Sequence, residues 1–402
     1  MRVVILRRSP KASVSMDVYA DRLIEGLRSV RPNWTIMETC PMLPPGDVKG
    51  LSKGIVGVGK YYERYWQYPR RLKSMNADIF HIIDHSDGHL SRWLRRSRLP
   101  NVVTCHDLIN LIKPETFRGR AAFPVVSMAA WRWGVKGMRQ AEHVIAVSSH
   151  TKRDIVEHLD IPSSTITVVP NAVDREFRCL PVTEITAVRN EYGLHPETFC
   201  LLNVGSNNAR KNISGILAVV STLKQQGVPV HFWKIGVDFT SEQIEFIKTQ
   251  GIAPYVTYLG KPEPYRLVQI YNAADCLMAP SLYEGFGLTI LEAMACGTPV
   301  ITANVSAMPE VAGDAAILVE PTDKSGIVEA VQHLFTHHKE QKSLIQKGLD
   351  RARRFTWEHT AEQVAKVYEQ VLFQAKPTAP TSLKSTSVKS YPSTSTSINS
   401  FS

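Results

Sequence analysis

Two carboxylates, Glu284 and Glu292, are separated by seven residues in a glycine-containing segment. Glu284 lies in a turn that reaches Gly287, and the apolar residues that follow predict a short helix from Leu288 that Gly297 ends. Glycine lets a backbone approach a ligand closely, and free N–H groups at a helix start favour an anion such as a diphosphate. Glu292 can lean back toward ribose hydroxyls because helical side chains point toward the N-terminus, and Glu284 is expected on the other side of the phosphates. One carboxylate that binds a ribose and one that binds a sugar would form a nucleotide-sugar site. The alternative is a surface turn followed by a core helix, with both glutamates solvated.

A second loop brings cations to the junction between a strand and a helix. The expected strand Phe199–Gly205 precedes Arg210 and Lys211, and a helix is expected from about Ile213. A glycine-containing loop with two cations at such a junction can hold a diphosphate by charge and by backbone N–H donors. Two solvated cations on a surface loop would produce the same sequence pattern, so spacing alone leaves both interpretations open.

His106 is the candidate from the first half of the chain. It follows the expected strand Asn101–Cys105 and precedes Asp107, a carboxylate that can fix the tautomer of the imidazole. A lone histidine is more often structural than catalytic. Its place at the carboxyl end of a strand, beside a carboxylate, is what favours a role in the site.

A polar cluster follows the expected strand Ala77–Ile83, at the edge where open α/β sheets bind ligands. Its candidate metal ligands are His81, Asp84, His85, Asp87 and His89. Their spacing fits no usual metal site, so we expect no metal here.

The composition is that of a basic globular protein. Of the 402 residues, 44% are hydrophobic and 21% charged, and the formal net charge is +10. This balance suits an anionic donor, a lipid-phosphate acceptor or an anionic membrane, and no zinc, helix-turn-helix or RNA-binding signature supports a nucleic-acid partner. Six scattered cysteines indicate a reducing compartment, and no apolar run is long enough to span a bilayer. We therefore expect a cytoplasmic protein, with peripheral contact at the inner membrane surface as a further option.

Basic and aromatic residues interleave over Lys60–Lys73. Such a pattern is typical of a surface that touches lipid head groups or a glycan. The alternative is a helix whose aromatic residues pack on the core while its cations face water.

Several of these segments resemble the retaining glycosyltransferases of family 4 (glycosyl transferases group 1), which have the GT-B fold. Ser281–Ile301 resembles the Glu-x7-Glu signature of that family, and the similarity continues through Met308–Asp314. Ile166–Asp174 resembles a Val-Pro-Asn-Gly-Val-Asp segment of the family, with Ala172 in place of the glycine. Arg210–Asn212 resembles its phosphate-binding Lys-Asn pair.

The chain departs from the family pattern at two further places. The loop Arg7–Met16 lies where many relatives carry a Gly-Gly pair, and it contains no glycine. Many relatives also have an arginine directly after the residue that corresponds to Gly205, where this chain has Ser206. Arg210 is expected to compensate for that change.

The resemblance implies transfer of a hexose from a nucleoside diphosphate sugar, of the UDP or GDP type, with retention at the anomeric carbon and without a metal or a cofactor. It implies that Glu284 orients the sugar, that His106 positions and polarises its reacting face, and that Arg210 and Lys211 stabilise the departing diphosphate. Closure of two domains would exclude water. The donor-binding residues expected in addition are Gly205, Lys261, Phe286, Gly287, Leu288 and Glu292.

The alternation of strands and helices predicts an α/β protein with two Rossmann-like, doubly wound parallel-sheet domains that face a central cleft. We expect an N-terminal, acceptor-side domain over residues 1–178 and a nucleotide-sugar-binding domain over residues 179–354. Residues 355–374 are expected to form a helix that crosses back to the first domain. The Ser/Thr-rich residues 375–402 are expected to be a disordered tail.

Other functions stay open beside a glycosyltransferase. An epimerase or a phosphorylase can share the same architecture, although a phosphorylase needs a lysine that carries pyridoxal phosphate and no local signature singles one out. A catalytically silent nucleotide-sugar binder or partner subunit is the rival from another class. The joint presence of His106, Lys211, Glu284 and Glu292 argues against it. A glycan, a lipid-linked sugar and a small molecule all remain as acceptors.

Overall fold

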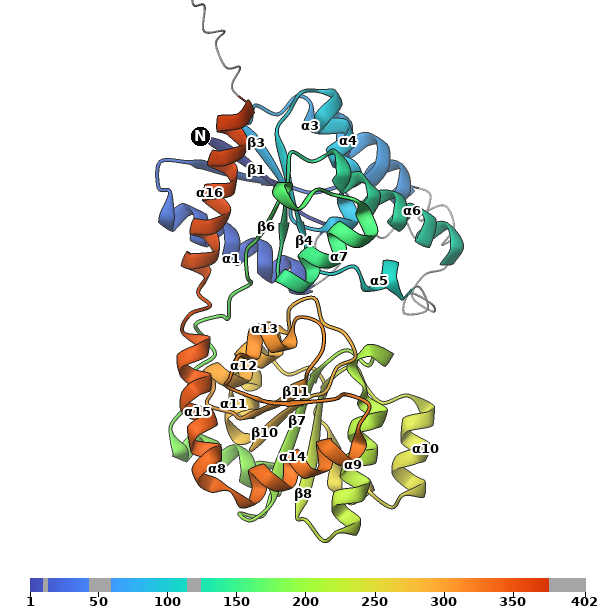
Figure 1. The fold of residues 1–402 in the computed structure, drawn as a ribbon, viewed down its shortest axis with the longest axis vertical. Coiled ribbons are helices and arrows are strands. Elements are labelled where there is room, and N and C mark those ends of the chain that lie inside the picture. Colours follow the sequence, from blue (N-terminus) through green and yellow to red (C-terminus); the bar gives the residue numbers. More distant parts are fainter. Residues whose placement is uncertain (10–13, 43–58, 114–123, 376–402) are drawn as a thin grey trace, which may run out of the picture.

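The computed structural model describes residues 1–9, 14–42, 59–113 and 124–375 as two α/β domains, one above the other along the long axis in Figure 1. Each domain is built on a six-stranded sheet in which all paired strands are parallel. Parallel neighbours need crossover connections, and helices supply them and cover the sheet faces. The prediction of two doubly wound parallel-sheet domains is therefore confirmed. The expected disordered tail lies outside the described residues from residue 376 onward.

The N-terminal sheet has the strand order β2-β1-β3-β4-β5-β6. Its strands are β1 (Arg2–Leu6), β2 (Thr35–Thr39), β3 (Ile79–Ile82), β4 (Asn101–Cys105), β5 (His143–Ala146) and β6 (Ile166–Val168). The α-helices of this part are α1 (Val14–Val30), α3 (Tyr68–Leu72), α4 (His89–Arg96), α5 (Ile109–Ile112), α6 (Pro124–Lys136) and α7 (Ser149–Leu159). Shorter helical turns are η1 (Glu63–Gln67), η2 (His85–Asp87), η4 (Gly137–Gln140) and η5 (Ser163–Thr165).

Alternate residues of each strand enter different cores, because successive side chains of a strand point to opposite faces. Val3 and Ile5 of β1 pack in a core with α1, whereas Val4 and Leu6 pack in a core with α4 and α7. Since helices cover both faces, both sets of positions must be apolar. This explains why β1 has an unbroken apolar run rather than an alternating pattern.

The second sheet has the order β12-β11-β10-β7-β8-β9. Its strands are β7 (Phe199–Gly205), β8 (Val230–Gly236), β9 (Val256–Tyr258), β10 (Cys276–Ala279), β11 (Val300–Ala303) and β12 (Ile317–Val319). The α-helices of the second half are α8 (Val182–Glu191), α9 (Ile213–Gln225), α10 (Ser241–Thr249), α11 (Pro264–Ala273), α12 (Leu288–Ala295), α13 (Met308–Ala312), α14 (Lys324–Thr336), α15 (His338–Ala352) and α16 (Trp357–Ala375). Two short turns, η6 (Ala209–Lys211) and η7 (Ala253–Tyr255), complete this part of the structure.

Helix α16 packs on α1 of the first domain, whereas α15, which precedes it in sequence, packs on α12 of the second domain (Figure 1). A Cβ atom on Gly26 of α1 would lie 2.8 Å from Cβ of Ala361, so the two helices can approach closely only because this residue is glycine. Apolar residues of α16 enter the same core as Val3 and Ile5. In space, the last described helix is thus part of the first domain.

The carboxyl ends of strands from both sheets meet where the two domains touch. His106 directly follows β4, and a Cβ atom on Gly285 of the second domain would lie 1.9 Å from its carbonyl oxygen. Only glycine permits this approach. The hydroxyl groups of Ser148 and Thr151, which follow β5, donate hydrogen bonds to the Gly285 carbonyl at 2.7 and 3.0 Å.

Candidate functional site

The Glu284 carboxylate lies between two cations. Its oxygens are 2.5 Å from the guanidinium of Arg210 and 2.7 Å from Nζ of Lys211. Arg210 also donates to the carbonyl of Tyr283 at 2.9 Å, which ties the two loops together. Burial by itself raises the pKa of Glu284, but the charges of Lys211 and Arg210 outweigh it and lower the pKa to about 2. Glu284 is therefore a carboxylate at any physiological pH.

The two cations are presented by the turn η6, directly after β7. The side chain of Asn208 accepts a hydrogen bond from the backbone N–H of Arg210 and so caps this turn. Asn212 then takes a left-handed conformation with φ 56° and leads into α9. A Cβ atom on Gly205 would lie 3.4 Å from Cε of Lys211, so the glycine leaves room for the lysine side chain at the end of the strand.

Lys234 is a third cation of this site, which the sequence analysis missed. It lies in β8 with no exposed surface, and its Nζ donates to the carbonyls of Gly205 and Ile235 at 2.9 and 2.7 Å. Burial lowers the pKa of the ammonium group to about 8, with a smaller effect from the charge of Lys211. The sequence feature that could have indicated this residue is a lysine inside the otherwise apolar run Phe232–Ile235.

The start of α12 is set by a glycine. Gly287 has φ 102°, a left-handed conformation that side chains rarely adopt, and it precedes the first helical residue, Leu288. The helix itself is held by the core through Ile290, Leu291 and Met294. The N–H of Ile290 donates to the carbonyl of Gly287 at 3.0 Å, and the two N–H groups before it have no partner one turn earlier in the helix, so they can donate to an anion.

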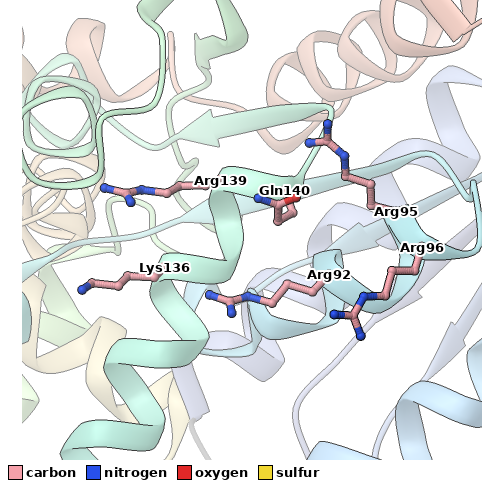
Figure 2. A pocket seen from close by; sticks show the side chains of 6 residues that line it. All are labelled: Arg92, Arg95, Arg96, Lys136, Arg139 and Gln140. Carbon is pink, nitrogen blue, oxygen red and sulfur yellow. The ribbon is translucent and has the colours of Figure 1, made fainter.

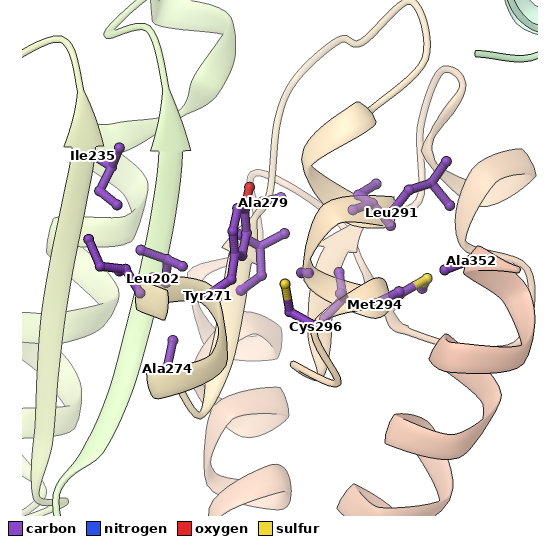
Figure 3. Close-up of a cluster of buried hydrophobic side chains, with 14 of the residues drawn as sticks. Leu202, Ile235, Tyr271, Ala274, Ala279, Leu291, Met294, Cys296 and Ala352 are labelled. Atoms are coloured by element: carbon purple, nitrogen blue, oxygen red, sulfur yellow. The ribbon is translucent and has the colours of Figure 1, made fainter. Parts of the chain in front are cut away.

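Glu292 projects from α12 and is held by Tyr271 of α11, whose hydroxyl donates to Oε2 at 2.6 Å. The Tyr271 ring itself lies in the apolar core that includes Leu202, Leu291 and Met294 (Figure 3). Burial raises the pKa of Glu292, while the hydrogen bond from Tyr271 acts in the opposite direction. Oε1 is not part of that bond, so the carboxylate keeps acceptor capacity for a ligand hydroxyl.

His106 is fixed by backbone groups of the first domain. Its Nε2 lies 2.8 Å from the carbonyl of Ile83, and because a carbonyl only accepts, Nε2 carries the proton. Tyr19 packs edge-on against the ring at a centroid distance of 4.8 Å. Burial lowers the pKa of His106, and the charge of Asp84 offsets this only in part. The imidazole is thus neutral at pH 7, with Nδ1 as its acceptor.

The expected role of Asp107 is wrong. Its carboxylate accepts a hydrogen bond from the backbone N–H of Ile109 at 3.1 Å and thereby stabilises the turn after β4. The tautomer of His106 is set by Ile83 instead. Adjacency in sequence was misleading because neighbouring residues at a strand end point in different directions.

Phe286 and Lys261 were also predicted to contact the donor, but their side chains are placed differently from those of the charged residues. The Phe286 side chain is buried in the core and packs edge-on against Phe355 at 6.0 Å, so only its backbone can serve a ligand. Lys261 is exposed in the loop after β9, and within the described residues it makes no hydrogen bond or ion pair. Of the other residues predicted to contact the donor, Gly205 ends β7, and Gly287 and Leu288 lie at the start of α12.

The polar cluster near β3 is occupied by structural contacts. His81 lies 2.6 Å from the hydroxyl of Tyr368 and 2.7 Å from that of Thr104, and burial lowers its pKa to about 3. Asp87 forms an ion pair with Arg64 at 2.6 Å. In the part of the chain that the structure describes, no three His, Cys, Asp or Glu side chains are arranged to hold a metal ion.

The second domain is held against the first by side chains that the sequence did not single out. Besides Ser148 and Thr151 on the Gly285 carbonyl, the Tyr283 hydroxyl donates to the Asp154 carboxylate of α7. These contacts flank the turn that carries Glu284, so they link donor-side and acceptor-side residues. Tyr283 and Asp154 are 129 positions apart in the sequence, so no local sequence pattern predicts their contact.

Two family models match this chain. The model described as glycosyl transferases group 1 matches residues 184–351, and the model described as glycosyltransferase family 4 matches residues 51–177. The chain belongs to glycosyltransferase family 4. The group 1 segment holds both glutamates and the three cations, while His106 lies within the family 4 segment.

Several curated relatives of this family 4 member are bacterial proteins. The serotype-specific mannosyltransferase WbdA of Escherichia coli is 26% identical over 319 residues, which are 76% of this chain and 38% of the relative. This chain thus spans well under half the length of that relative. The O-antigen chain mannosyltransferase B of Escherichia coli is 27% identical over 312 residues, or 75% of this chain and 78% of the relative. The D-inositol 3-phosphate glycosyltransferase of Nocardia farcinica is 28% identical over 320 residues, or 76% and 70%.

Solved structures support the same fold. Sucrose-phosphate synthase from Thermosynechococcus elongatus superposes with a TM-score of 0.74 at 20% identity over 93% of this chain and 100% of its own. Anabaena Alr3699/HepE in complex with UDP and glucose gives 0.72 at 17% identity over 92% and 100%. At these identities the similarity establishes the two-domain GT-B fold of this family 4 member.

Proposed function

We propose that this chain is a retaining hexosyltransferase that takes its sugar from a nucleoside diphosphate donor without a metal ion. The observation that carries the proposal is the pairing of the buried Glu284 carboxylate with Arg210 and Lys211, at 2.5 and 2.7 Å, in the turn that leads into α12. A buried carboxylate between two cations, next to a helix start, suits a ligand that has both hydroxyls and a diphosphate.

The cations act on the leaving group. As the glycosidic bond breaks, negative charge grows on the diphosphate, and fixed positive charge stabilises it without reorganisation. Arg210 and Lys211 supply this charge, and Lys234 adds a third cation beneath the same loop through the Gly205 carbonyl. Side-chain charge thereby does what a divalent cation does in other phosphate sites.

The carboxylates and the histidine position the donor. Glu284 remains ionised and accepts hydrogen bonds from sugar hydroxyls, while Glu292 accepts from the ribose. His106, neutral and with Nδ1 as acceptor, faces the sugar from the other domain. Contact between the domains through Gly285 keeps water from the reacting carbon.

The similar proteins narrow the substrates to be tested. Two relatives bear the name of mannosyltransferases and one that of an inositol 3-phosphate glycosyltransferase, and HepE has been crystallised with UDP-glucose. We therefore expect a GDP- or UDP-linked hexose as donor. A growing glycan, a lipid-linked sugar or a phosphorylated small molecule is the expected acceptor.

Donor binding is tested by thermal unfolding against GDP-mannose, UDP-glucose and related sugar nucleotides. A donor at a hundredfold excess over its Kd adds about 2.7 kcal/mol to the free energy of unfolding. The shift should appear in the wild type and in Lys324→Ala, an exposed lysine of α14, and be lost in Lys211→Ala and Glu292→Ala. Failure of every sugar nucleotide to stabilise the wild type would refute the proposal.

The stereochemistry and the metal requirement are tested on the product. With the donor identified, NMR of the transferred or hydrolysed sugar should show the same anomeric configuration as the donor. Turnover should persist in EDTA. An inverted product, or activity that returns only when Mg²⁺ or Mn²⁺ is added, would contradict the corresponding part of the mechanism, while binding without turnover would favour a silent sugar-nucleotide binder.

A further inference from the structure

A cavity on the first domain is lined almost entirely by cations. It has a volume of about 520 Å³ and lies between α4 and the segment formed by the end of α6 and η4 (Figure 2). Its lining residues are Arg92, Arg95, Arg96, Lys136, Arg139 and Gln140. No acidic side chain is among them, so these positive charges repel one another. A bound anion would remove this repulsion.

Among the described residues, most of these charges have no ion-pair partner. Arg139 pairs with Asp160 at 2.5 Å, but within the described residues no ion pair involves Arg92 or Arg96. Nε of Arg92 is buried and has no hydrogen-bond partner there. Burial lowers the pKa of the Arg92 guanidinium, and the charge of Arg96 acts in the same direction. The Arg92 guanidinium donates through Nη2 to the Trp133 carbonyl at 3.3 Å, so it keeps one buried, unpaired N–H at Nε, and an anion in this cavity could satisfy that donor.

Exposed aromatic residues continue the cavity along the same surface. The guanidinium of Arg92 lies 4.7 Å from the centre of the Trp133 ring. Beside it on α4, Trp93 packs edge-on against Trp66 at 5.7 Å. The guanidinium of Arg70 lies 4.4 Å from the Trp66 ring. Trp66 and Trp133 remain 43% and 41% exposed, although such large rings are normally covered.

We propose that this cationic–aromatic surface, made by η1, α3, α4, α6 and η4, docks the protein on an anionic lipid bilayer. Arginine and lysine bind lipid phosphates, and tryptophan rings settle at the level of the head groups. In the described part of the chain no helix is long and apolar enough to cross a membrane, so the contact is peripheral.

A lipid surface fits these residues better than a nucleic acid does. Proteins that bind single strands need open aromatic faces on which bases stack. Here the guanidinium groups of Arg70 and Arg92 already lie over the rings of Trp66 and Trp133. A ring with a cation over its face has only its edge and the positive charge left for a partner, so a base cannot stack on it.

The cationic cavity of the docking surface lies at the opposite edge of the first sheet from His106, whereas η1 and Trp133 contact Asp87 and His89, which follow β3. Arg96 ends α4 just before the amino end of β4, and Gln140 ends η4 just before that of β5. His106, in contrast, follows the carboxyl end of β4. Binding to a membrane therefore leaves the donor residues uncovered, and the inference does not depend on the proposed function.

The test is co-sedimentation with vesicles of phosphatidylglycerol and phosphatidylcholine, compared with phosphatidylcholine alone. The triple variant Arg95→Ala/Arg96→Ala/Lys136→Ala removes three exposed cations of the surface. Since each cation near an anionic bilayer contributes about fivefold in affinity, we expect a loss on the order of a hundredfold. A control with the same charge loss on the second domain, at the exposed lysines Lys324, Lys339 and Lys342, should bind like the wild type.

A second variant tests the aromatic part. Trp66→Ala/Trp133→Ala keeps the charge, so it should bind at low salt and lose binding in 0.5 M salt sooner than the wild type. The inference is overturned if neutral vesicles bind equally well, or if the control triple loses as much affinity as the test triple. It is also overturned if wild-type protein ignores both vesicles but binds an RNA oligonucleotide, or pyrophosphate, in a manner that the test triple abolishes. An unchanged melting temperature shows that each variant is folded.

Discussion

Glu284 is the side chain on which the charges of the proposed donor site converge. Its two cations come from the loop after β7, and its own turn follows β10, so the ion pairs join neighbouring strands of the sheet. Such a buried arrangement is sensitive to the loss of any one member, because the remaining charges are left unpaired away from water.

The acid stability of the protein should report on this carboxylate. Its pKa is lowered from 4.5 to about 2, so its contribution is complete above pH 4.5 and is lost as the pH falls toward 2. The stability advantage of the wild type over Glu284→Gln should therefore shrink by roughly 3 kcal/mol between pH 5 and pH 2. Urea unfolding at a series of pH values measures it, with the exposed Glu329→Gln as control. A difference that does not vary with pH would contradict the assignment.

Lys234 should make donor affinity depend on pH in the alkaline range. Its pKa is lowered to about 8 because it is buried, so it loses its proton as the pH rises through that value. The loop then has one cation fewer for the diphosphate, and we expect the Kd of the donor to rise between pH 7 and pH 9.5. Lys234→Arg, which stays charged throughout, should show a flatter profile. Calorimetric titration of both proteins makes the comparison, and parallel profiles would exclude Lys234 as the titrating group.

The charged residues of the site could be predicted to very different degrees. Arg210, Lys211 and Glu284 stand in loops with a clear local signal of glycine and charge at strand ends, and the structure brings them together. Lys234 was missed because a single polar residue in a buried strand looks like an exception to an apolar run. Its meaning appears only when the Gly205 carbonyl is placed beside it.

At the scale of elements, the start of α12 is central to the proposed donor site. Gly287, in a left-handed conformation, starts this helix at the same edge of the sheet as Lys211, and the N–H groups of Leu288 and Thr289 are available there to an anion. The body of the helix is apolar and fixed in the core, which keeps this end in place.

Gly287→Ala should damage both stability and donor binding. The φ of 102° is unfavourable for alanine, and the added Cβ would lie 3.0 Å from Cδ1 of Ile290. We expect a loss of about 1–2 kcal/mol in stability and at least a tenfold weaker donor. Gly297→Ala at the other end of α12 is the matched control, since its φ of 73° carries a similar strain away from the ligand. Equal effects of both variants on donor Kd would show that strain alone is responsible.

The elements themselves were largely predictable, whereas their side-chain contacts were not. Strands buried on both faces appear as unbroken apolar runs, so the alternation of β1, β3, β4 and the later strands with helices is visible in the sequence. Phe286 illustrates the limit: it lies in the signature segment, yet its ring packs against Phe355 in the core. Spacing along the chain does not tell which side of a turn faces a ligand.

At the scale of the whole molecule, the proposed mechanism requires the two domains to meet. They meet where Gly285 lies against the His106 carbonyl, flanked by the hydroxyls of Ser148 and Thr151 and by the Tyr283–Asp154 contact. These contacts come from strand ends of both sheets, so they form only when the donor and acceptor sides are aligned.

Gly285→Ala should hold the domains apart. Its Cβ would lie 1.9 Å from the His106 carbonyl oxygen and 2.8 Å from Cβ of Asp107, so one side must move. Misplacement by about 1 Å at a reacting centre costs on the order of a hundredfold in rate. We expect that loss in kcat, a larger radius of gyration in X-ray scattering, and little change in donor Kd. Gly193→Ala meets no atom within 4 Å, so it should affect none of the three, although its φ of 65° makes alanine unfavourable and costs some stability. An unchanged radius of gyration with full activity would show that the contact is not needed.

The position of α16 has a consequence for how the protein is made. The core that holds Val3 and Ile79 is completed by Val364, Tyr368 and other residues of α16. A ribosome releases the first strand long before it reaches that helix, and at 5–20 residues per second the delay from β6 to α16 is on the order of 10–40 s. During this interval the nascent first domain exposes an apolar face that the second domain does not cover. Synthesis of α16, rather than of residues 1–168 alone, is then the step that protects this face from aggregation or chaperone binding.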